Sequence, residues 1–288
     1  MASPDTAADT RPGLAEAPLD PDRRGGELTV RLRDLHKSFG PKKVLTGIDL
    51  DVRTGESLVI IGASGTGKSV LLKHVIGLMQ PDRGLVEVDG IDVSTLGYRE
   101  ITRFRRRFGM AFQEGALFDS MTVRENVAFP LKRQTKRPLA EIYERVDGCL
   151  EMVRLGGIGD KMPAQLSGGM RRRVGFARAI ALEPQIVLFD EPTTGLDPVT
   201  TAQIDEVILD LLGRLDSTAI TITHDMTSAF RIADRIGMLH EGKIIALAPP
   251  EEFRRSDDPR VQQFIRGESS GPLSDDDGGD RRAGKGRA

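Results

Sequence analysis

The sequence predicts an α/β fold with a mostly parallel core sheet, an antiparallel β edge and a helical subdomain. Two continuous apolar runs, 57–61 and 186–189, predict parallel strands, because strands that are covered on both faces lack polar alternation. The alternating segments 28–32 and 48–52 predict half-buried antiparallel strands. Residues from about 114 to 165 show helical spacing without a strand, which indicates a helical subdomain inserted into the sheet.

The remaining elements follow from apolar periodicity and from turn residues along the chain. The last two strands form a hairpin across Glu241 and Gly242. We expect helices at 70–78, 95–107, 123–129, 139–155, 171–181, 200–215 and 227–233, and further strands at 86–88, 110–113, 219–223, 235–239 and 243–248.

The domain organisation is simple. A chain of 288 residues can form one domain of roughly 230–240 residues with tails. We expect the ordered domain at 27–267. The tails at 1–26 and 268–288 lack periodic apolar positions and are rich in small and polar residues, so we predict that both are disordered.

Composition excludes several classes of protein. The chain carries 41 Lys and Arg against 43 Asp and Glu, so bulk charge gives no reason to expect a nucleic-acid partner. Cys149 is the one cysteine, which excludes an internal disulfide framework and favours a small apolar core residue. No apolar run approaches the ~20 residues that span a bilayer, and the first residues do not resemble a signal peptide. We therefore expect a cytoplasmic protein that meets a membrane only through partners.

A glycine-rich loop follows the strand at 57–61 and opens a helix, which is the context of a P-loop. Its backbone N–H groups can converge on phosphate oxygens at the helix N-terminus. Lys68 can reach the β- and γ-phosphates of a nucleoside triphosphate, and the Ser69 hydroxyl can ligate Mg²⁺. A chance glycine-rich turn does not explain the complete pattern of Gly62, Ala63, Ser64, Gly65, Thr66, Gly67, Lys68 and Ser69.

Two acidic residues end the second buried run. Asp190 and Glu191 emerge at the carboxyl edge of the predicted parallel sheet, beside the P-loop. Asp190 can hold the Mg²⁺ shell, and Glu191 is the candidate general base for an attacking water. The alternative is a strand-end acidic pair that caps the next helix, and the presence of a phosphate loop for Asp190 to serve favours the metal-binding interpretation.

A second anion site is predicted at 166–170, where Ser167, Gly168 and Gly169 open another helix. Ser167 as an ordinary N-cap is the alternative interpretation. One chain has one triphosphate loop, so a second anion site requires an explanation.

Together these segments resemble the ABC ATPase family, over roughly 28–267. The resemblance implies a P-loop NTPase fold of the ABC ATPase type that hydrolyses ATP with Mg²⁺. It also implies a homodimer in which Ser167, Gly168 and Gly169 of one copy cover the ATP held by the P-loop of the other copy. The fifth residue of this segment is Met170, where the family usually has Gln.

The resemblance assigns roles to four more residues. Phe39 matches the aromatic residue that stacks on adenine, and Gln113 matches a glutamine that contacts Mg²⁺ and water and senses the membrane subunit. Asp197 matches a residue that crosses the dimer interface. His224 matches a histidine that contacts the γ-phosphate. The implied catalytic residues are thus Glu191, His224, Gln113 and Lys68, and the implied metal ligands are Ser69, Gln113 and Asp190.

The segment after Gln113 indicates the kind of transporter. Residues 114–130, together with 166–170, 190–198 and 258–267, resemble the ATPases of the Mla/Mce lipid transport systems. This resemblance implies a multi-span permease, an MCE-domain lipid-binding protein and a phospholipid or other hydrophobic cargo. It also implies a place at the cytoplasmic face of a bacterial inner membrane, where the permease holds the ATPase.

Three alternatives stay open at this point. The chain is an ABC ATPase of an importer or exporter for a different substrate, a non-transport ABC protein that acts on nucleic acid or ribosomes, or a soluble P-loop kinase or GTPase. The second class uses two cassettes in one chain or a long coiled coil, and the sequence shows one cassette without a long heptad run. The third class does not need the segment at 166–170.

Overall fold

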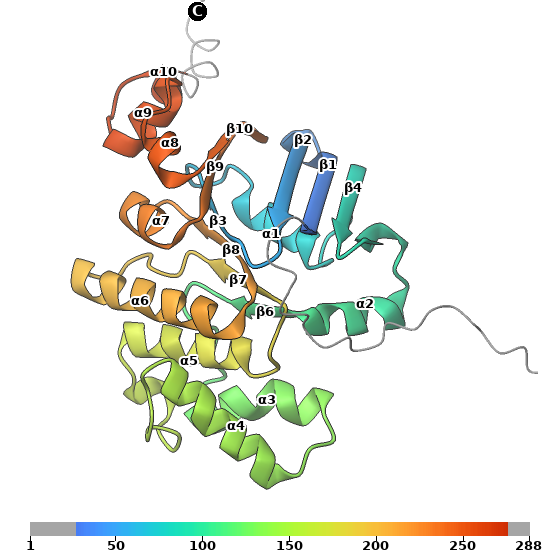
Figure 1. Ribbon diagram of the computed structural model, residues 1–288, viewed down its shortest axis with the longest axis vertical. Coiled ribbons are helices and arrows are strands. Elements are labelled where there is room, and N and C mark those ends of the chain that lie inside the picture. Colours follow the sequence, from blue (N-terminus) through green and yellow to red (C-terminus); the bar gives the residue numbers. More distant parts are fainter. Residues whose placement is uncertain (1–26, 276–288) are drawn as a thin grey trace, which may run out of the picture.

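The computed structural model describes residues 27–275 (Figure 1). The tail predicted at 1–26 and the last residues from 276 lie outside the described part of the chain. Within it the strands form two sheets, with helices packed against them and a group of helices set below (Figure 1).

The first sheet is antiparallel and has the strand order β2-β1-β4-β5. It contains β1 (Leu28–Phe39), β2 (Lys42–Arg53), β4 (Arg83–Val88) and β5 (Ile91–Asp92). These strands form a sheet of their own, whereas the sequence predicted an edge of the core sheet. The alternating segments 28–32 and 48–52 are the paired outer ends of one long hairpin, whose inner part carries many charged residues that mask the pattern.

The second sheet is the core sheet and has the order β10-β9-β3-β8-β7-β6. Neighbours from β9 to β6 are parallel, and β10 joins β9 as the predicted antiparallel hairpin. The carboxyl ends of parallel strands share one edge, so the segments that follow β3, β7 and β8 meet there. The bounds are β3 (Ser57–Ile61), β6 (Phe108–Ala111), β7 (Ile186–Asp190), β8 (Thr218–Thr223), β9 (Arg235–His240) and β10 (Lys243–Ala248).

Four helices connect these strands or lie beside them: α1 (Lys68–Val75), α2 (Tyr98–Phe104), α6 (Pro198–Leu215) and α7 (Met226–Ile232). Short 3₁₀ turns lie at 93–95, 105–107 and 163–165. None of the helices in residues 27–275 is long and apolar enough to cross a membrane.

The helical subdomain contains α3 (Val123–Gln134) and α4 (Leu139–Met152), which lie below α5 (Gly168–Ile180) in Figure 1. Thr122 begins α3 with a capping box to Glu125. The sequence predicted that this helix ends at 129, before Pro130. The helix continues to Gln134. Pro130 removes one backbone hydrogen bond, but the buried residues of α3 on both sides of it pack against the core and keep the helix intact.

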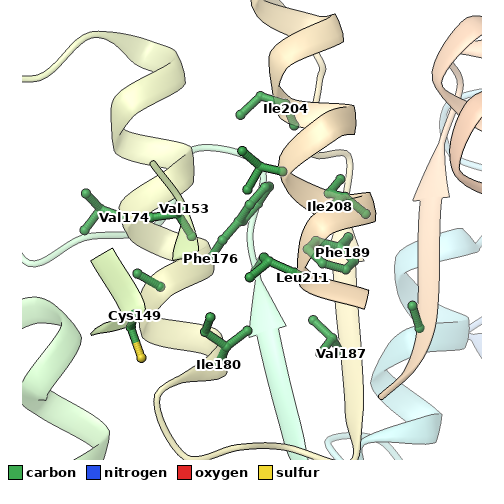
Figure 2. Packing of buried hydrophobic residues seen from close by; sticks show 14 of the residues in the cluster. Cys149, Val153, Val174, Phe176, Ile180, Val187, Phe189, Ile204, Ile208 and Leu211 are labelled. Atoms are coloured by element: carbon green, nitrogen blue, oxygen red, sulfur yellow. The ribbon is translucent and has the colours of Figure 1, made fainter. Parts of the chain in front are cut away.

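Helix α5 joins the subdomain to the core sheet. Figure 2 shows Phe176 of α5 packed between the subdomain and the residues of β7 and α6. The rings of Phe176 and Phe189 are 5.2 Å apart at 80°, a favourable edge-to-face contact. Cys149 is fully buried in the same cluster, as predicted, and burial raises the pKa of its thiol to about 11.

The described part of the chain ends in three short helices, α8 (Pro250–Arg254), α9 (Pro259–Arg266) and α10 (Pro272–Asp275). The buried Gln263 side chain accepts from the N–H of Leu273 and donates to the Ser274 hydroxyl and the Glu268 carbonyl. These bonds order residues 268–275, which the sequence assigned to a disordered tail. A single buried amide on α9 is the physical reason for the difference.

Candidate active site

The glycine-rich loop lies between β3 and α1, at the carboxyl edge of the core sheet. Gly62 has φ +156°, and a Cβ at this position would lie 2.4 Å from the carbonyl oxygen of Leu239. Only glycine lets the loop pass β9 this closely. No side chain caps the N-terminus of α1, so its first N–H groups are available to an anion.

Lys68 is buried at the base of this loop, with 6% of its surface exposed. Its Nζ donates to the carbonyl oxygens of Gly62 (2.7 Å) and Ala63 (3.0 Å). The Glu191 Oε1 atom lies 3.6 Å from Nζ. Burial lowers the pKa of Lys68, and the negative charge of Glu191 acts against this shift.

Glu191 follows β7 in a left-handed backbone conformation with φ +50°, which is uncommon for a residue other than glycine. Its N–H donates to the Ile222 carbonyl on β8. The Glu191 Oε2 atom accepts from the Thr194 hydroxyl (2.8 Å) and lies 2.8 Å from Nδ1 of His224. Since a carboxylate can only accept, the histidine nitrogen donates to it. Two donors and the backbone therefore fix this carboxylate.

Ser69 and Asp190 lie side by side next to this group, with Oγ and Oδ1 3.4 Å apart. Burial raises the pKa of Asp190, and the neighbouring charge of Glu191 raises it further. Hydroxyl and carboxylate oxygens are the donors that Mg²⁺ prefers. Residues 27–275 contain no cluster of three His, Cys, Asp or Glu side chains that could hold a metal alone. The pair therefore fits an ion that takes its other ligands from phosphate and water.

Gln113 and Phe39 lie on two other elements, and no hydrogen bond or ion pair in residues 27–275 joins either side chain to Lys68, Ser69, Asp190 or Glu191. Gln113 is exposed and comes shortly after β6, the neighbour of β7, and its carbonyl accepts from Arg172. Phe39 ends β1 with 47% of its surface exposed. The hairpin that carries it reaches the P-loop, because a Cβ on Gly67 would lie 2.9 Å from Cγ1 of Val44.

The second predicted anion site lies at the N-terminus of α5. The Ser167 hydroxyl accepts from the Met170 N–H (3.2 Å) as an N-cap. Gly169 approaches α6 so closely that a Cβ would lie 2.7 Å from Cγ2 of Thr200. Asp197 caps α6 with bonds from the Val199 and Thr200 N–H groups.

These two groups of residues are separate within one chain. In residues 27–275, no hydrogen bond or ion pair joins Ser167, Gly168 or Gly169 to the glycine-rich loop at 62–69. The structure thus brings together Lys68, Ser69, Asp190, Glu191 and His224, and it places Ser167, Gly168, Gly169 and Asp197 in a second group.

Two residues of the site were not found from the sequence. Thr194 lies three residues after Glu191, and its hydroxyl holds the carboxylate. Arg172 lies in a run of three arginines on α5. The run looks like a solvated helix face, and only the fold shows that its middle member is buried.

The fold and the group of Lys68, Ser69, Asp190, Glu191 and His224 define a P-loop nucleoside triphosphatase. The family model described as ABC transporter matches residues 45–194. The chain is 43% identical over 246 residues to the probable ribonucleotide transport ATP-binding protein mkl of Mycobacterium leprae, covering 85% of this chain and 71% of that protein. It is 40% identical over 244 residues to the intermembrane phospholipid transport system ATP-binding protein MlaF of Haemophilus influenzae, covering 85% and 92%.

A solved structure gives the same result. A dimeric ATP-binding cassette in a post-hydrolysis state, bound to ADP and Pi, superposes with a TM-score of 0.70 at 33% identity, covering 77% of this chain and 98% of that chain. The chain belongs to the ABC transporter family and is one of its ATP-hydrolysing subunits.

Proposed function

We propose that the protein works as a homodimer that closes around two ATP molecules and drives a separate permease that moves phospholipid. The observation that carries the catalytic part is the convergence of Lys68, Glu191 and His224 beside the glycine-rich loop. A carboxylate held by two donors, close to a phosphate-binding lysine, suits the activation of a water molecule.

Glu191 acts as the general base in this proposal. Thr194 and His224 occupy Oε2, so Oε1, which in residues 27–275 is paired only with Lys68 at 3.6 Å, is the atom that accepts a proton from water. Lys68 Nζ, 3.6 Å from Oε1, lies where the β- and γ-phosphates enter the loop. His224 keeps the carboxylate oriented and contacts the γ-phosphate. The water attacks the γ-phosphorus in line with the bond to the β–γ bridging oxygen, that bond breaks so that ADP leaves, and Glu191 takes up the proton of the water as inorganic phosphate forms.

Ser69 and Asp190 would hold Mg²⁺, and Gln113 would reach the ion and the attacking water. The ion supplies positive charge that neutralises the phosphate oxygens as the bond breaks. The short Ser69–Asp190 distance and the oxygen chemistry of both groups support this assignment. Phe39 would stack on adenine, since the β1–β2 hairpin runs along the loop.

The second anion site supports the proposed dimer. Within residues 27–275, Ser167, Gly168 and Gly169 make no hydrogen bond to the chain's own P-loop, so the ATP of a partner copy is the proposed ligand of this helix N-terminus. Asp197 lies beside them and would cross the same interface. The solved relative bound to ADP and Pi is itself a dimer.

The docking surface for the permease is proposed at 112–129. Two large apolar side chains in it are exposed, Phe112 at 40% and Phe118 at 41%. The buried Asn126 amide orders the loop between Phe118 and Thr122 with four hydrogen bonds. An exposed apolar surface on an ordered loop, joined to Gln113, suits a helix of a membrane subunit.

Phospholipid is the proposed cargo, and an MCE-domain protein is a proposed further partner. The support is the likeness to MlaF, whose name states intermembrane phospholipid transport, over 92% of that protein. The permease would hold the ATPase at the cytoplasmic face of the inner membrane. Ribonucleotide is the second candidate cargo, because the mkl relative carries that name.

Reconstitution of the complex in liposomes tests the cargo. The purified ATPase, permease and partner proteins are supplied with ATP, and labelled phospholipid and labelled ribonucleotide are followed in parallel. We expect ATP-dependent movement of phospholipid alone. ATP-dependent movement of ribonucleotide without movement of phospholipid would contradict the proposed cargo. The assignment of the protein as an ATPase would not be affected.

A further inference from the structure

One buried side chain on α5 connects two loops near the site. Arg172, on α5, has 7% of its surface exposed. Its Nε donates to the Gln113 carbonyl (2.5 Å), and its Nη2 donates to the Thr194 carbonyl. The Thr194 hydroxyl in turn holds Oε2 of Glu191 at 2.8 Å. A path of two hydrogen bonds therefore runs from Arg172 on helix α5, through Thr194, to the carboxylate of Glu191.

A second arginine holds the loop after Gln113 to the same helix. Arg178 donates to the carbonyl oxygens of Gly115 and Ala116, each at 2.7 Å. The two backbones touch, because a Cβ on Gly175 would lie 2.9 Å from the Cα of Gly115. Helix α5 and residues 113–116 are thus held as one body, and Arg172 extends this body to Thr194.

Burying the Arg172 guanidinium costs stability, so its presence requires a specific role. Burial lowers the pKa of its guanidinium, and no carboxylate forms an ion pair with it in residues 27–275. The buried Nη1 has no hydrogen-bond partner. A buried charge that is only partly satisfied costs stability relative to an apolar side chain. We infer that its role is to fix the positions of the loops at Gln113 and Thr194.

We propose that Arg172 is a positioning residue that fixes the Thr194 turn, and through Thr194 the carboxylate of Glu191, relative to helix α5. This inference rests on the proposed role of Glu191. Ser167 and its neighbours begin the same helix and serve the ATP of the partner copy, whereas Glu191 serves the ATP of its own chain. Arg172 therefore connects the two ATP sites of the dimer through one rigid helix.

The test compares Arg172→Gln with a matched control, Arg145→Gln. Like Arg172, Arg145 donates to two backbone carbonyls, but these are Ile180 and Ala181 at the C-terminal end of α5. We expect Arg172→Gln to lower kcat for ATP by about tenfold to a hundredfold, the usual effect of a displaced catalytic group, with KM within about twofold. We expect Arg145→Gln to lower thermal stability about as much as Arg172→Gln does, but to leave kcat at the wild-type value.

A double-mutant cycle with Thr194→Val identifies the path. If Arg172 acts through Thr194, then Arg172→Gln in the Thr194→Val background should lower kcat by less than about threefold, because neighbours in one network are not additive. If Arg172→Gln folds poorly, Arg172→Lys replaces it, because lysine keeps the charge but cannot reach both the Gln113 and the Thr194 carbonyls. We expect the same non-additive loss of kcat with Thr194→Val. Independent, multiplicative effects, or a wild-type kcat in Arg172→Gln, would overturn the inference.

Glu191→Gln, measured in the same series, separates this inference from the proposed function. If Glu191→Gln still hydrolyses ATP at the wild-type rate, the role of Glu191 is wrong whatever Arg172 does. If Glu191→Gln is inactive while Arg172→Gln is normal, only the role of Arg172 is wrong.

Discussion

His224 Nδ1 lies 2.8 Å from Oε2 of Glu191, although the two residues are 33 positions apart in the chain. They meet because β7 and β8 are parallel neighbours in which Asp190 pairs with Ile222, so both strands deliver their next residues to one edge. The Thr194 hydroxyl holds the same oxygen. The two donors to Oε2 thus orient the carboxylate, and Oε1 is the oxygen that we propose accepts the proton.

Glu191→Gln should nearly abolish ATP hydrolysis and keep ATP binding. Gln has the same shape and can still meet the Thr194 hydroxyl, but it cannot accept a proton from water. Loss of a general base typically lowers the rate about 10²–10⁴-fold. Steady-state phosphate release and equilibrium binding of labelled ATP measure the two effects separately.

Glu206→Gln is the control for this substitution. Glu206 is also paired, with Arg154 and Arg231, but on the exposed face of α6. Exposed ion pairs contribute about 0–1 kcal/mol, so this variant should hydrolyse ATP normally. Hydrolysis by Glu191→Gln at the rate of Glu206→Gln would exclude Glu191 as the base.

The pH dependence of stability should contain a contribution from Asp205. This carboxyl lies between α6 and α7 with 1% of its surface exposed, and burial raises its pKa to about 6. In the unfolded chain its pKa is that of an ordinary aspartate, about 3.9. Between these values the folded chain binds more protons, so its stability falls as the pH rises from about 4 to about 6.

Asp205→Asn should remove this pH-dependent loss. The neutral amide can still accept from the Ser228 hydroxyl, which donates to Asp205 at 3.1 Å. We expect the variant to gain on the order of 1 kcal/mol relative to wild type between about pH 4.5 and about pH 7.5. Urea unfolding at both values measures the gap, and a gap that does not change with pH would refute the assignment.

Phe118→Asp should weaken assembly with the permease and leave ATP binding by the isolated subunit intact. The Phe118 ring lies 4.8 Å from the Phe129 ring, and 41% of its surface is exposed. Burial of such an apolar side chain contributes about 1.5–3 kcal/mol, which a buried charge reverses. Co-purification from solubilised membranes is the measurement.

Leu139→Asp is the matched control, because Leu139 is a large apolar residue in the same subdomain with 53% of its surface exposed. It lies at the start of α4, outside 112–129, and should not affect assembly. Equal loss of the complex in both variants would point to a general effect on the subdomain and contradict the proposed docking surface.

The sequence predicted the α/β core and the residues that follow its strands because both depend on local patterns. Apolar runs defined β3 and β7, and glycine spacing defined the loop at 62–67. The bonds that hold Glu191 could not be predicted in this way. The Thr194 hydroxyl bonds Glu191 only because the turn between them points it there, and Arg172 bonds Thr194 from a helix 22 positions away.

Two elements were wrongly predicted for a related reason. Helix α3 passes through Pro130, and residues 268–275 fold onto Gln263. In both cases tertiary contacts outweigh a local signal, a proline in the first and polar composition in the second.

The central claim is that each ATP lies between the P-loop of one copy and the α5 N-terminus of the other. Differently tagged chains, both carrying Glu191→Gln to prevent turnover, test it when one also carries Ser167→Arg and the other Lys68→Ala. The mixed dimer then has one composite site with both groups intact and one with neither. Affinity capture through the tag of the Lys68→Ala chain should co-purify the Ser167→Arg chain only when ATP is present. Each mixed dimer should hold about one ATP, because one of its two composite sites is intact. Absence of this capture, or equal ATP-dependent pairing of Ser167→Arg chains with one another, would contradict the account.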